Sequence, residues 1–401
     1  MSENASRDGP ADCGHTSLRT ASTFRNVITP AVLFRLALGW GAFAAVLTAE
    51  PVLSAHLPSP LLVGVLVGIT AVIIVCAFGV VAEAEHLAHR LGDPYGTLVL
   101  TLSIVLIEVV LISAVMLGPG EHLTIARDSV MAVSMIILNL VIGIALLVGG
   151  MRHGALEPNR TGVSSYLSLL VVLTTLAFVL PGLIGSDGAY GRGQEIPIIA
   201  LTVLLYAFFL HLQMGRQRAD FQEVSPRHSV TGTSDAVAVR RPPITEVLSQ
   251  HRKEVGLRAV TLVMTVLPIV LLSHDMAALL DDGLDRAGAP VALSGILIAM
   301  IVFLPETITA VRAAHAGEIQ RVSNLCHGAL VSTVGLTIPA VLTIGLLTGQ
   351  TVVLAEDPTN LALLGVTLLL SVTTFAGKKV TPLHGAAHLL VFLIYGLTVF
   401  S

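Results

Sequence analysis

Charged residues are scarce in this 401-residue chain, since Asp, Glu, Lys and Arg together make up only 12% of it. A soluble domain carries about twice that fraction, so a water-soluble fold is a poor fit. The 22 basic residues are outnumbered by 26 acidic ones, and a net charge of −4 argues against nucleic acid as a partner. Three widely spaced cysteines, Cys13, Cys76 and Cys326, indicate neither a disulfide framework nor a metal site.

Apolar residues make up 54% of the chain, and they gather in runs of about the length that a helix needs to cross a bilayer. The sequence therefore predicts an all-α polytopic membrane protein. The first run follows a polar tail that carries Arg7, Arg19 and Arg25, but no signal-peptide cleavage site follows it, so we expect a retained helix. We predict eleven transmembrane helices, at 31–49, 59–82, 96–118, 129–150, 165–185, 196–214, 255–273, 289–313, 322–348, 359–376 and 382–400.

Lysine and arginine are distributed unevenly between the two sides of these predicted helices. With the N-terminus inside, the inner segments hold 17 of them and the outer segments hold only three, Arg127, Arg192 and Arg286. Basic residues resist translocation, so the count predicts an N-terminus inside and a C-terminus outside. The expected location is the cytoplasmic (inner) membrane.

One long polar segment, 216–254, divides the chain and reads as a cytoplasmic linker without regular structure, because prolines and a Thr-Gly-Thr-Ser run interrupt it. The role of this linker stays open. The predicted organisation is a cytoplasmic tail, an extra transmembrane helix, a first repeat, the linker and a second repeat, at 1–30, 31–50, 55–215, 216–254 and 255–401.

The two halves repeat one another weakly. Glu108 lies in the third predicted helix and Glu306 in the eighth, and an Arg-x-Ser triplet opens the next helix in both halves, at 127–129 and 321–323. A competing register would align Asn139 with Asn324 instead, but it pairs a mid-helix residue with one at a helix start. Each repeat contains five helices, which is an odd number, so helices 2–6 and 7–11 are predicted to be inverted repeats, as in many secondary transporters.

Glu108 and Glu306 are the only acidic residues deep within any predicted helix. A charge at the bilayer centre costs roughly 2.5–3.5 kcal/mol on insertion scales, and two equivalent carboxylates meeting near the midplane must hold either protons or a metal ion. We therefore predict that both glutamates bind a cation and protons in competition. The alternative is that each is protonated or hydrogen-bonded and only holds helices together.

Neutral oxygen ligands suitable for a hard cation lie nearby in the sequence. Asn139 is in the middle of its predicted helix, and the repeat register places it opposite Thr333, beside Ser332. Thr309 is predicted to lie on the same helical face as Glu306, and Thr101 on the same face as Glu108. Pro305 and Pro339 lack an N–H, so each releases a main-chain carbonyl in its helix.

Four segments resemble the bacterial calcium/proton exchanger branch of the calcium/cation antiporter superfamily. They are Gly92-Asp-Pro-Tyr-Gly96, Leu304-Pro-Glu306-Thr-Ile-Thr-Ala-Val-Arg312, Gly335-Leu-Thr-Ile-Pro-Ala340 and His384-Gly-Ala-Ala-His388. The resemblance implies two inverted five-helix repeats behind an extra helix, with the cation bound by Glu108 and Glu306. The family pattern has Gly-Asn shortly before each glutamate, whereas this chain has Ile104-Val105 and Val302-Phe303. Exchange of Na⁺ or K⁺ for H⁺ therefore stays open beside Ca²⁺.

Other polar residues have weaker claims on function. Glu83, His327 and Asn324 are candidates for a proton or cation pathway, although a solvated helix end and a satisfied interior histidine are the simpler explanations for the first two. His384 and His388 have the i, i+4 spacing of a zinc-protease helix, but no glutamate lies between them to act as the base.

We therefore expect a secondary antiporter and not an enzyme, without a resident cofactor, whose substrates are Ca²⁺, or Na⁺ or K⁺, and H⁺. Its expected surroundings are membrane lipid, and its oligomeric state stays open. An uncoupled cation channel that uses the same oxygen atoms is the alternative from another functional class.

Overall fold

The computed structural model describes residues 27–53, 57–91, 95–116, 123–223, 244–289 and 292–400. Within these ranges the regular structure is helical, and the β-type pairing consists of three isolated bridges between loops. The helices are α2 Pro30–Leu53, α3 Ser59–Leu91, α4 Tyr95–Met116, α5 Ile125–Met135, η1 Ile136–Val141, α6 Ile142–His153, α7 Arg160–Thr174, η2 Thr175–Val179, α8 Leu180–Ile184, α9 Arg192–Met214, η3 Arg218–Phe221, α10 Ile244–Arg286, α11 Ala292–Val302, α12 Leu304–Ala316, α13 Ile319–Thr348, α14 Pro358–Ala376 and α15 Pro382–Val399.

The prediction of an all-helical, multi-pass membrane protein is confirmed. Nine helices or continuous helical segments of the described chain are long and apolar enough to cross a membrane. The two other predicted crossings coincide with α4 and with the pair α11 and α12. The total of eleven crossings stays a prediction.

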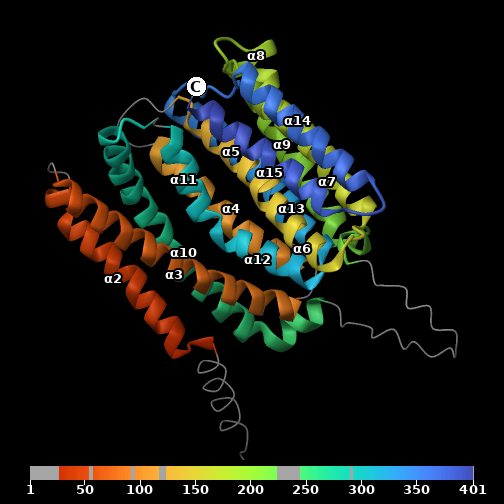
Figure 1. The fold of residues 1–401 in the computed structure, drawn as a ribbon, viewed down its shortest axis with the longest axis horizontal. Coiled ribbons are helices and arrows are strands. Elements are labelled where there is room, and N and C mark those ends of the chain that lie inside the picture. The colour runs from red at the N-terminus through yellow and green to blue at the C-terminus, as the bar shows by residue number, and fades with distance from the viewer. Residues whose placement is uncertain are drawn as a thin grey trace, which may run out of the picture.

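The helices form two parts that lie against each other (Figure 1). α2, α3 and the long α10 lie together along one side, and the other helices form the larger bundle. Among the nine segments, the two most enclosed are 125–153, in which 83% of the apolar stretch is buried, and α13, in which 67% is buried. These two segments are the predicted repeat mates, whereas α2 is only 11% buried and lies at the edge.

The predicted inner loops contact one another, and so do the predicted outer loops. On the predicted inner side, Leu156 pairs with Val380 through backbone hydrogen bonds of 3.1 and 2.9 Å. On the predicted outer side, Ala189 and Val353 form an isolated antiparallel bridge, and the backbone N–H groups of Leu354 and Ala355 donate to the carbonyl of Gly188 at 3.0 Å. These contacts support alternating crossings.

The expectation that all of 216–254 lacks regular structure is wrong at both ends. The last eleven residues belong to α10, which begins directly after Pro242-Pro243, because proline before a helix start costs no hydrogen bond. At the other end, η3 folds back onto the bundle and buries Phe221 against Tyr166 and Phe209. The intervening residues 224–243, like the predicted tail up to residue 26, lie outside the described part of the chain.

Candidate functional site

Glu306 lies at a break in the eighth predicted crossing. The helix stops at Phe303, which has φ −85° and ψ 2°, and restarts with Leu304 and Pro305 in its first turn. Glu306 follows in that same turn, where the free N–H groups at a helix start favour a negative charge. The side chain is buried, with 5% of its surface exposed, and neither carboxylate oxygen has a hydrogen-bond partner among the described residues.

Glu108 occupies a different backbone setting, because α4 continues through it without a break. Its exposure is 7%. The Oγ1 hydroxyl of Thr333 donates a hydrogen bond of 2.8 Å to Oε2, while Oε1 has no donor in the described chain. The two glutamates that the sequence treats as equivalent thus differ in local structure.

The carboxyl groups of Glu108 and Glu306 lie close enough for their charges to interact. The charge of Glu306 also acts on the buried thiol of Cys326. Cys326 and Thr333 are seven residues apart on α13, which places them on the same face two turns apart. α13 therefore lies beside both glutamates. Three of the four carboxylate oxygens lack donors, which is an arrangement that needs protons or a cation to neutralise it.

The predicted neutral ligands divide into two groups. Thr309 donates its hydroxyl proton to the carbonyl of Pro305 on its own helix, at 2.9 Å, which leaves oxygen lone pairs that a cation can use. The hydroxyl of Thr101 bonds to the carbonyl of Leu98 on its own helix, at 3.2 Å. Ser332 is adjacent to Thr333 but contacts a different helix, since it accepts a hydrogen bond of 3.0 Å from the hydroxyl of Tyr206 on α9. The structure therefore joins Thr333, but not Ser332, to Glu108.

Asn139 lies in η1, a π-helical turn in the middle of a buried crossing. Its Nδ2 donates to Oγ1 of Thr367 at 2.9 Å, and its Oδ1 lies 3.3 Å from Nδ1 of His388. An amide oxygen cannot donate a hydrogen bond, so Nδ1 of His388 must carry the hydrogen. In the neutral ring Nε2 is then the acceptor, and the hydroxyl of Thr374 donates to it at 3.3 Å. In the described contacts, this amide is occupied by α14 and α15 and not by either glutamate.

A close approach of two helices makes the contact between Asn139 and His388 possible. Gly143 on α6 and Gly385 on α15 face each other, and a Cβ on Gly385 would lie 2.7 Å from the carbonyl oxygen of Gly143. Small residues at such crossings let backbones pack tightly. Thr367 and His388 as partners of Asn139, and Thr374 as a partner of His388, were not predicted from the sequence. The buried polar stripe Thr367, Ser371 and Thr374 on α14 was the available signal.

The candidate pathway residues are held in local contacts. Nδ1 of His327 lies 2.9 Å from Oγ of Ser323, and the ring packs edge-on against Phe375. Asn324 donates a hydrogen bond of 2.7 Å to the carbonyl of Phe221 and so anchors η3. Glu83 is not a solvated helix end: it is 5% exposed and forms an ion pair of 3.0 Å with Arg258 on α10.

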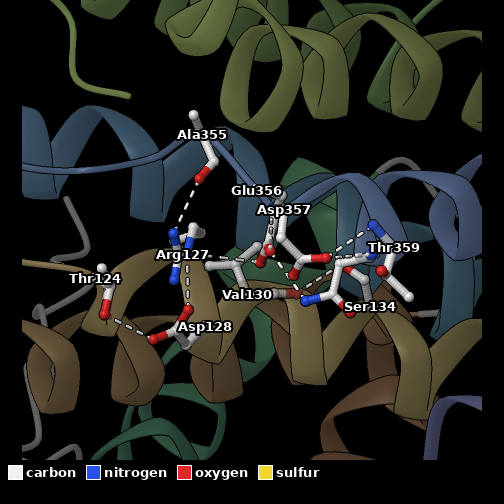
Figure 2. A network of polar contacts seen from close by, with 10 residues as sticks. Thr124, Arg127, Asp128, Val130, Ser134, Ala355, Glu356, Asp357 and Thr359 are labelled. Atoms are coloured by element: carbon white, nitrogen blue, oxygen red, sulfur yellow. Dashed lines mark hydrogen bonds and ion pairs between the residues drawn. The ribbon is translucent and has the colours of Figure 1, made fainter. Parts of the chain in front are cut away.

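A further polar network joins the start of α5 to the loop before α14 (Figure 2). Arg127 donates to the carbonyl of Ala355 at 3.0 Å, pairs with Asp128 at 2.8 Å and lies 3.9 Å from Glu356. Asn360 donates to the other oxygen of Glu356 at 3.0 Å. Burial raises the pKa of Glu356 above its ordinary value, while the hydrogen bond from Asn360 and the charge of Arg127 oppose that rise.

Comparison with known proteins agrees with this architecture. The chain resembles, in structure, a crystallised H⁺/Ca²⁺ exchanger, CAX, with a TM-score of 0.64 and 13% identity over 92% of this chain and 89% of that one. It resembles YfkE with a TM-score of 0.60 and 16% identity, over 91% and 99% of the two chains. At such identities the likeness concerns the fold alone. The fold is that of the membrane cation exchangers.

The sequence comparison identifies the family. The model of the family "Sodium/calcium exchanger protein" matches residues 61–215 and 257–401, so the chain belongs to this family. The proposed ionic transporter y4hA of Sinorhizobium fredii is 34% identical over 79% of this chain and 83% of its own length. The sodium-potassium/proton antiporter ChaA of Escherichia coli is 30% identical over 81% of this chain and 86% of its own length. The predicted membership of the calcium/cation antiporter superfamily is confirmed.

Proposed function

We propose that this exchanger couples the movement of a cation to counter-movement of protons, and that Glu108 and Glu306 are the groups at which the two compete. The observation that carries the proposal is that three of their four carboxylate oxygens are buried without a hydrogen-bond donor in the described chain. A purely structural pair of glutamates would have such donors, because unpaired buried oxygens destabilise a fold.

Coupling follows from the charge of the site. With both carboxylates ionised, the site carries two negative charges, which two protons or one divalent cation neutralise. The empty charged form is then the species least able to pass between inward-facing and outward-facing states, because moving it through a low-dielectric region is costly. Exchange is favoured over leak for this reason. The proposed protein is a carrier and neither an enzyme nor an open channel.

Ca²⁺ is the first candidate cation, because one Ca²⁺ balances the two carboxylates and prefers oxygen ligands. Na⁺ or K⁺ is the second candidate, and a specific observation favours it. Ca²⁺ takes 6–8 oxygen ligands, yet the amide of Asn139 is occupied by Thr367 and His388, and Ser332 contacts α9. The ChaA relative is named as a sodium-potassium/proton antiporter, which supports the same candidate.

The proposed location is the inner membrane of a bacterium, with the N-terminus in the cytoplasm and the C-terminus outside. The uneven distribution of Lys and Arg supports this orientation. The contacts between loops on the same predicted side are consistent with it.

The decisive experiment uses everted membrane vesicles with an acidic interior. Collapse of the pH gradient is measured after addition of Ca²⁺, Na⁺ or K⁺, for the wild type, Glu108→Gln and Glu306→Gln. We expect both variants to insert and fold but to lose exchange. Glu195→Gln is a matched control, because Glu195 is also buried and has one carboxylate oxygen without a partner, but it lies on another helix, in the first turn of α9. We expect this control to retain exchange.

Proteoliposomes separate a carrier from a channel. An imposed pH gradient should drive the cation uphill through a carrier, whereas a channel only lets it equilibrate. Robust exchange with unchanged pH dependence in both glutamine variants would show that the pair is structural. The ion that collapses the gradient at the lowest concentration identifies the cation.

A further inference from the structure

A cavity of 590 Å³ opens between α7 and α9, away from the two glutamates. It begins at Arg160, the first residue of α7, and extends along both helices toward the middle of the bundle's height. The lining of this groove comprises Arg160, Thr161, Ser164, Ser165, Ser168, Leu169, Leu205, Phe208, Phe209, Leu212 and Gln217.

The two walls of the groove have opposite chemistry. On α7, hydroxyl side chains at positions 161, 164, 165 and 168 follow the i, i+3, i+4, i+7 spacing of one helical stripe. On α9, large apolar side chains at 205, 208, 209 and 212 follow the same spacing. Among the described contacts, Ser165 donates its hydroxyl to its own helix, at 2.9 Å from the carbonyl of Thr161. Ser164 and Ser168 are exposed in the groove and have no such bond there.

The mouth of the groove is basic. Arg160 also lines a second hollow of 320 Å³, together with Lys378, Glu157, Pro158 and Asn159. The charge of Glu157 is balanced by Lys379, whose Nζ lies 3.9 Å from its carboxylate. Within the described chain, the side chains of Arg160 and Lys378 have no ion pair or hydrogen bond. Two uncompensated positive charges thus lie where a polar and an apolar wall begin.

The geometry points to a binding site for one anionic phospholipid. Its phosphate would lie at Arg160 and Lys378, its glycerol and ester oxygens would contact the α7 hydroxyls, and an acyl chain would cover the α9 wall. Eight residues separate Arg160 from Ser168, so the polar wall is about 12 Å long, which suits a headgroup and glycerol region. Basic hollows between membrane helices are typical sites for acidic headgroups.

Charge and shape together favour this ligand over a second copy of the chain. Close helix–helix contacts in membranes are enriched in small residues, whereas the α9 wall of this groove carries the large side chains of Leu205, Phe208, Phe209 and Leu212, and the surface there is hollow. A zwitterionic phospholipid fits the shape, but its headgroup has no net charge for Arg160 and Lys378 to neutralise.

The test measures lipid binding to the purified, intact protein in detergent, by native mass spectrometry and by thermal unfolding. The probes are phosphatidylglycerol and phosphatidylcholine with identical acyl chains. We expect phosphatidylglycerol to bind with one-to-one stoichiometry and to raise the unfolding temperature more than phosphatidylcholine does. Arg160→Gln and Lys378→Gln should each weaken phosphatidylglycerol binding about fivefold, the usual effect of one basic residue near a charged lipid surface.

Two further variants distinguish the groove from a general charge effect. Arg192→Gln removes the same charge from the opposite end of this helix pair and should leave binding unchanged. Ser164→Leu with Ser168→Leu makes the polar wall apolar, keeps both basic residues, and should weaken binding as well. Arg160→Lys should retain binding, which excludes misfolding as the cause of the loss.

Several results would overturn the proposal. Equal stabilisation by the two lipids would remove the role of charge. An equal loss of binding in Arg192→Gln would show that the lipid responds to net charge and not to the groove. A dimer in native mass spectrometry that Ser164→Leu with Ser168→Leu disrupts, without bound lipid, would make this face an interface between copies.

Discussion

The hydroxyl of Thr333 donates a hydrogen bond of 2.8 Å to the carboxylate of Glu108, and the two residues come from opposite repeats. Thr333 is on α13 in the second half of the chain, and Glu108 is on α4 in the first. This contact connects the halves at the proposed site. The repeat register had already placed Thr333 opposite Asn139, which is in the crossing after that of Glu108.

We predict that Thr333→Val weakens cation binding without unfolding the protein. The valine matches threonine in shape but removes the donor to Glu108, and a hydrogen bond to a charged group contributes about 1.5–3 kcal/mol. Apparent cation affinity in everted vesicles should fall about tenfold or more. Thr333→Ser keeps the hydroxyl and should retain most of the affinity. Equal affinity in the valine variant would show that the hydrogen bond has no part in binding.

Asn139 offers a test of the repeat register. Asn139→Ala should lower cation affinity more than it slows proton exchange, because the repeat register places Asn139 opposite Thr333, whose hydroxyl contacts Glu108. The substitution also leaves Thr367 and His388 without their buried partner, at a cost of about 1–3 kcal/mol in the stability of the fold. Asn324→Ala should have little effect on affinity, since Asn324 contacts the carbonyl of Phe221. A loss at Asn324 with none at Asn139 would favour the competing register.

The helix contact beside Asn139 gives a structural prediction. Gly385→Ala should disturb the pairing of Asn139 with His388, because the added Cβ would lie 2.7 Å from two backbone atoms of the facing helix. The unfolding temperature should fall and transport should weaken in the same direction as in His388→Gln. Gly396→Ala on the same helix is the control, since its Cβ would meet nothing within 4 Å.

The packing of residues 218–223 against the bundle should depend on pH. Glu223 accepts hydrogen bonds from the backbone N–H groups of Gln320 and Arg321, at 2.9 and 3.4 Å. The residue as a whole is exposed, but its carboxyl group lies against the start of α13, and the loss of water around that group raises its pKa to about 7. Since the packed state holds the proton more tightly than the free segment, packing should weaken as the pH rises from about 4.5 to about 7, and then level off.

A nitroxide label at the exposed Ala219 measures this packing by its mobility. Mobility should increase as the pH rises toward 7, and Glu223→Gln should remove the dependence. A decrease in mobility with rising pH would contradict the prediction. It would mean that the hydrogen bonds to the helix start, which favour the ionised carboxylate, outweigh burial.

Glu356 should make the protein less stable at alkaline pH. Burial raises the pKa of its carboxyl group in the folded protein, so ionisation costs stability as the pH rises. Glu356→Gln should therefore reduce the loss of thermal stability between pH 5 and 8. This range begins near the ordinary pKa of a glutamate and extends above it, because the pKa of Glu356 is raised. Asp128→Asn removes the exposed partner of Arg127. The charge of Asp128 raises the pKa of Glu356 less than burial does, so this variant should retain most of the loss of the wild type. If thermal stability depended on pH identically in the wild type and in Glu356→Gln, ionisation of Glu356 would not be the cause of the loss.

Orientation can be tested directly by cysteine labelling in a background without native cysteines. A cysteine at position 230 should react with an impermeant reagent only from the cytoplasmic side, and one at Ser401 only from outside. Reaction of position 230 from outside alone would contradict the predicted orientation and the repeat frame built on it.

The sequence by itself determined the class of protein and the location of its crossings. Runs of about twenty apolar residues are sufficient for this, because the bilayer forces each run to satisfy its own backbone hydrogen bonds as a helix. The two glutamates were visible for a related reason, since a charge in a crossing is too costly to be common. The inverted repeat followed from the odd number of helices in each half.

Only the tertiary structure decided what each polar side chain contacts. Neighbours on one helix point in directions about 100° apart, so Thr333 reaches Glu108 while Ser332 reaches Tyr206. The linker returns to the bundle through a contact between Asn324 and Phe221, which are separated by 103 positions in the sequence. Asn139 and His388, which also contact each other, are separated by 249 positions. Hydropathy records the depth of a residue in the membrane but not which helix faces it, and helix packing alone sets those partners.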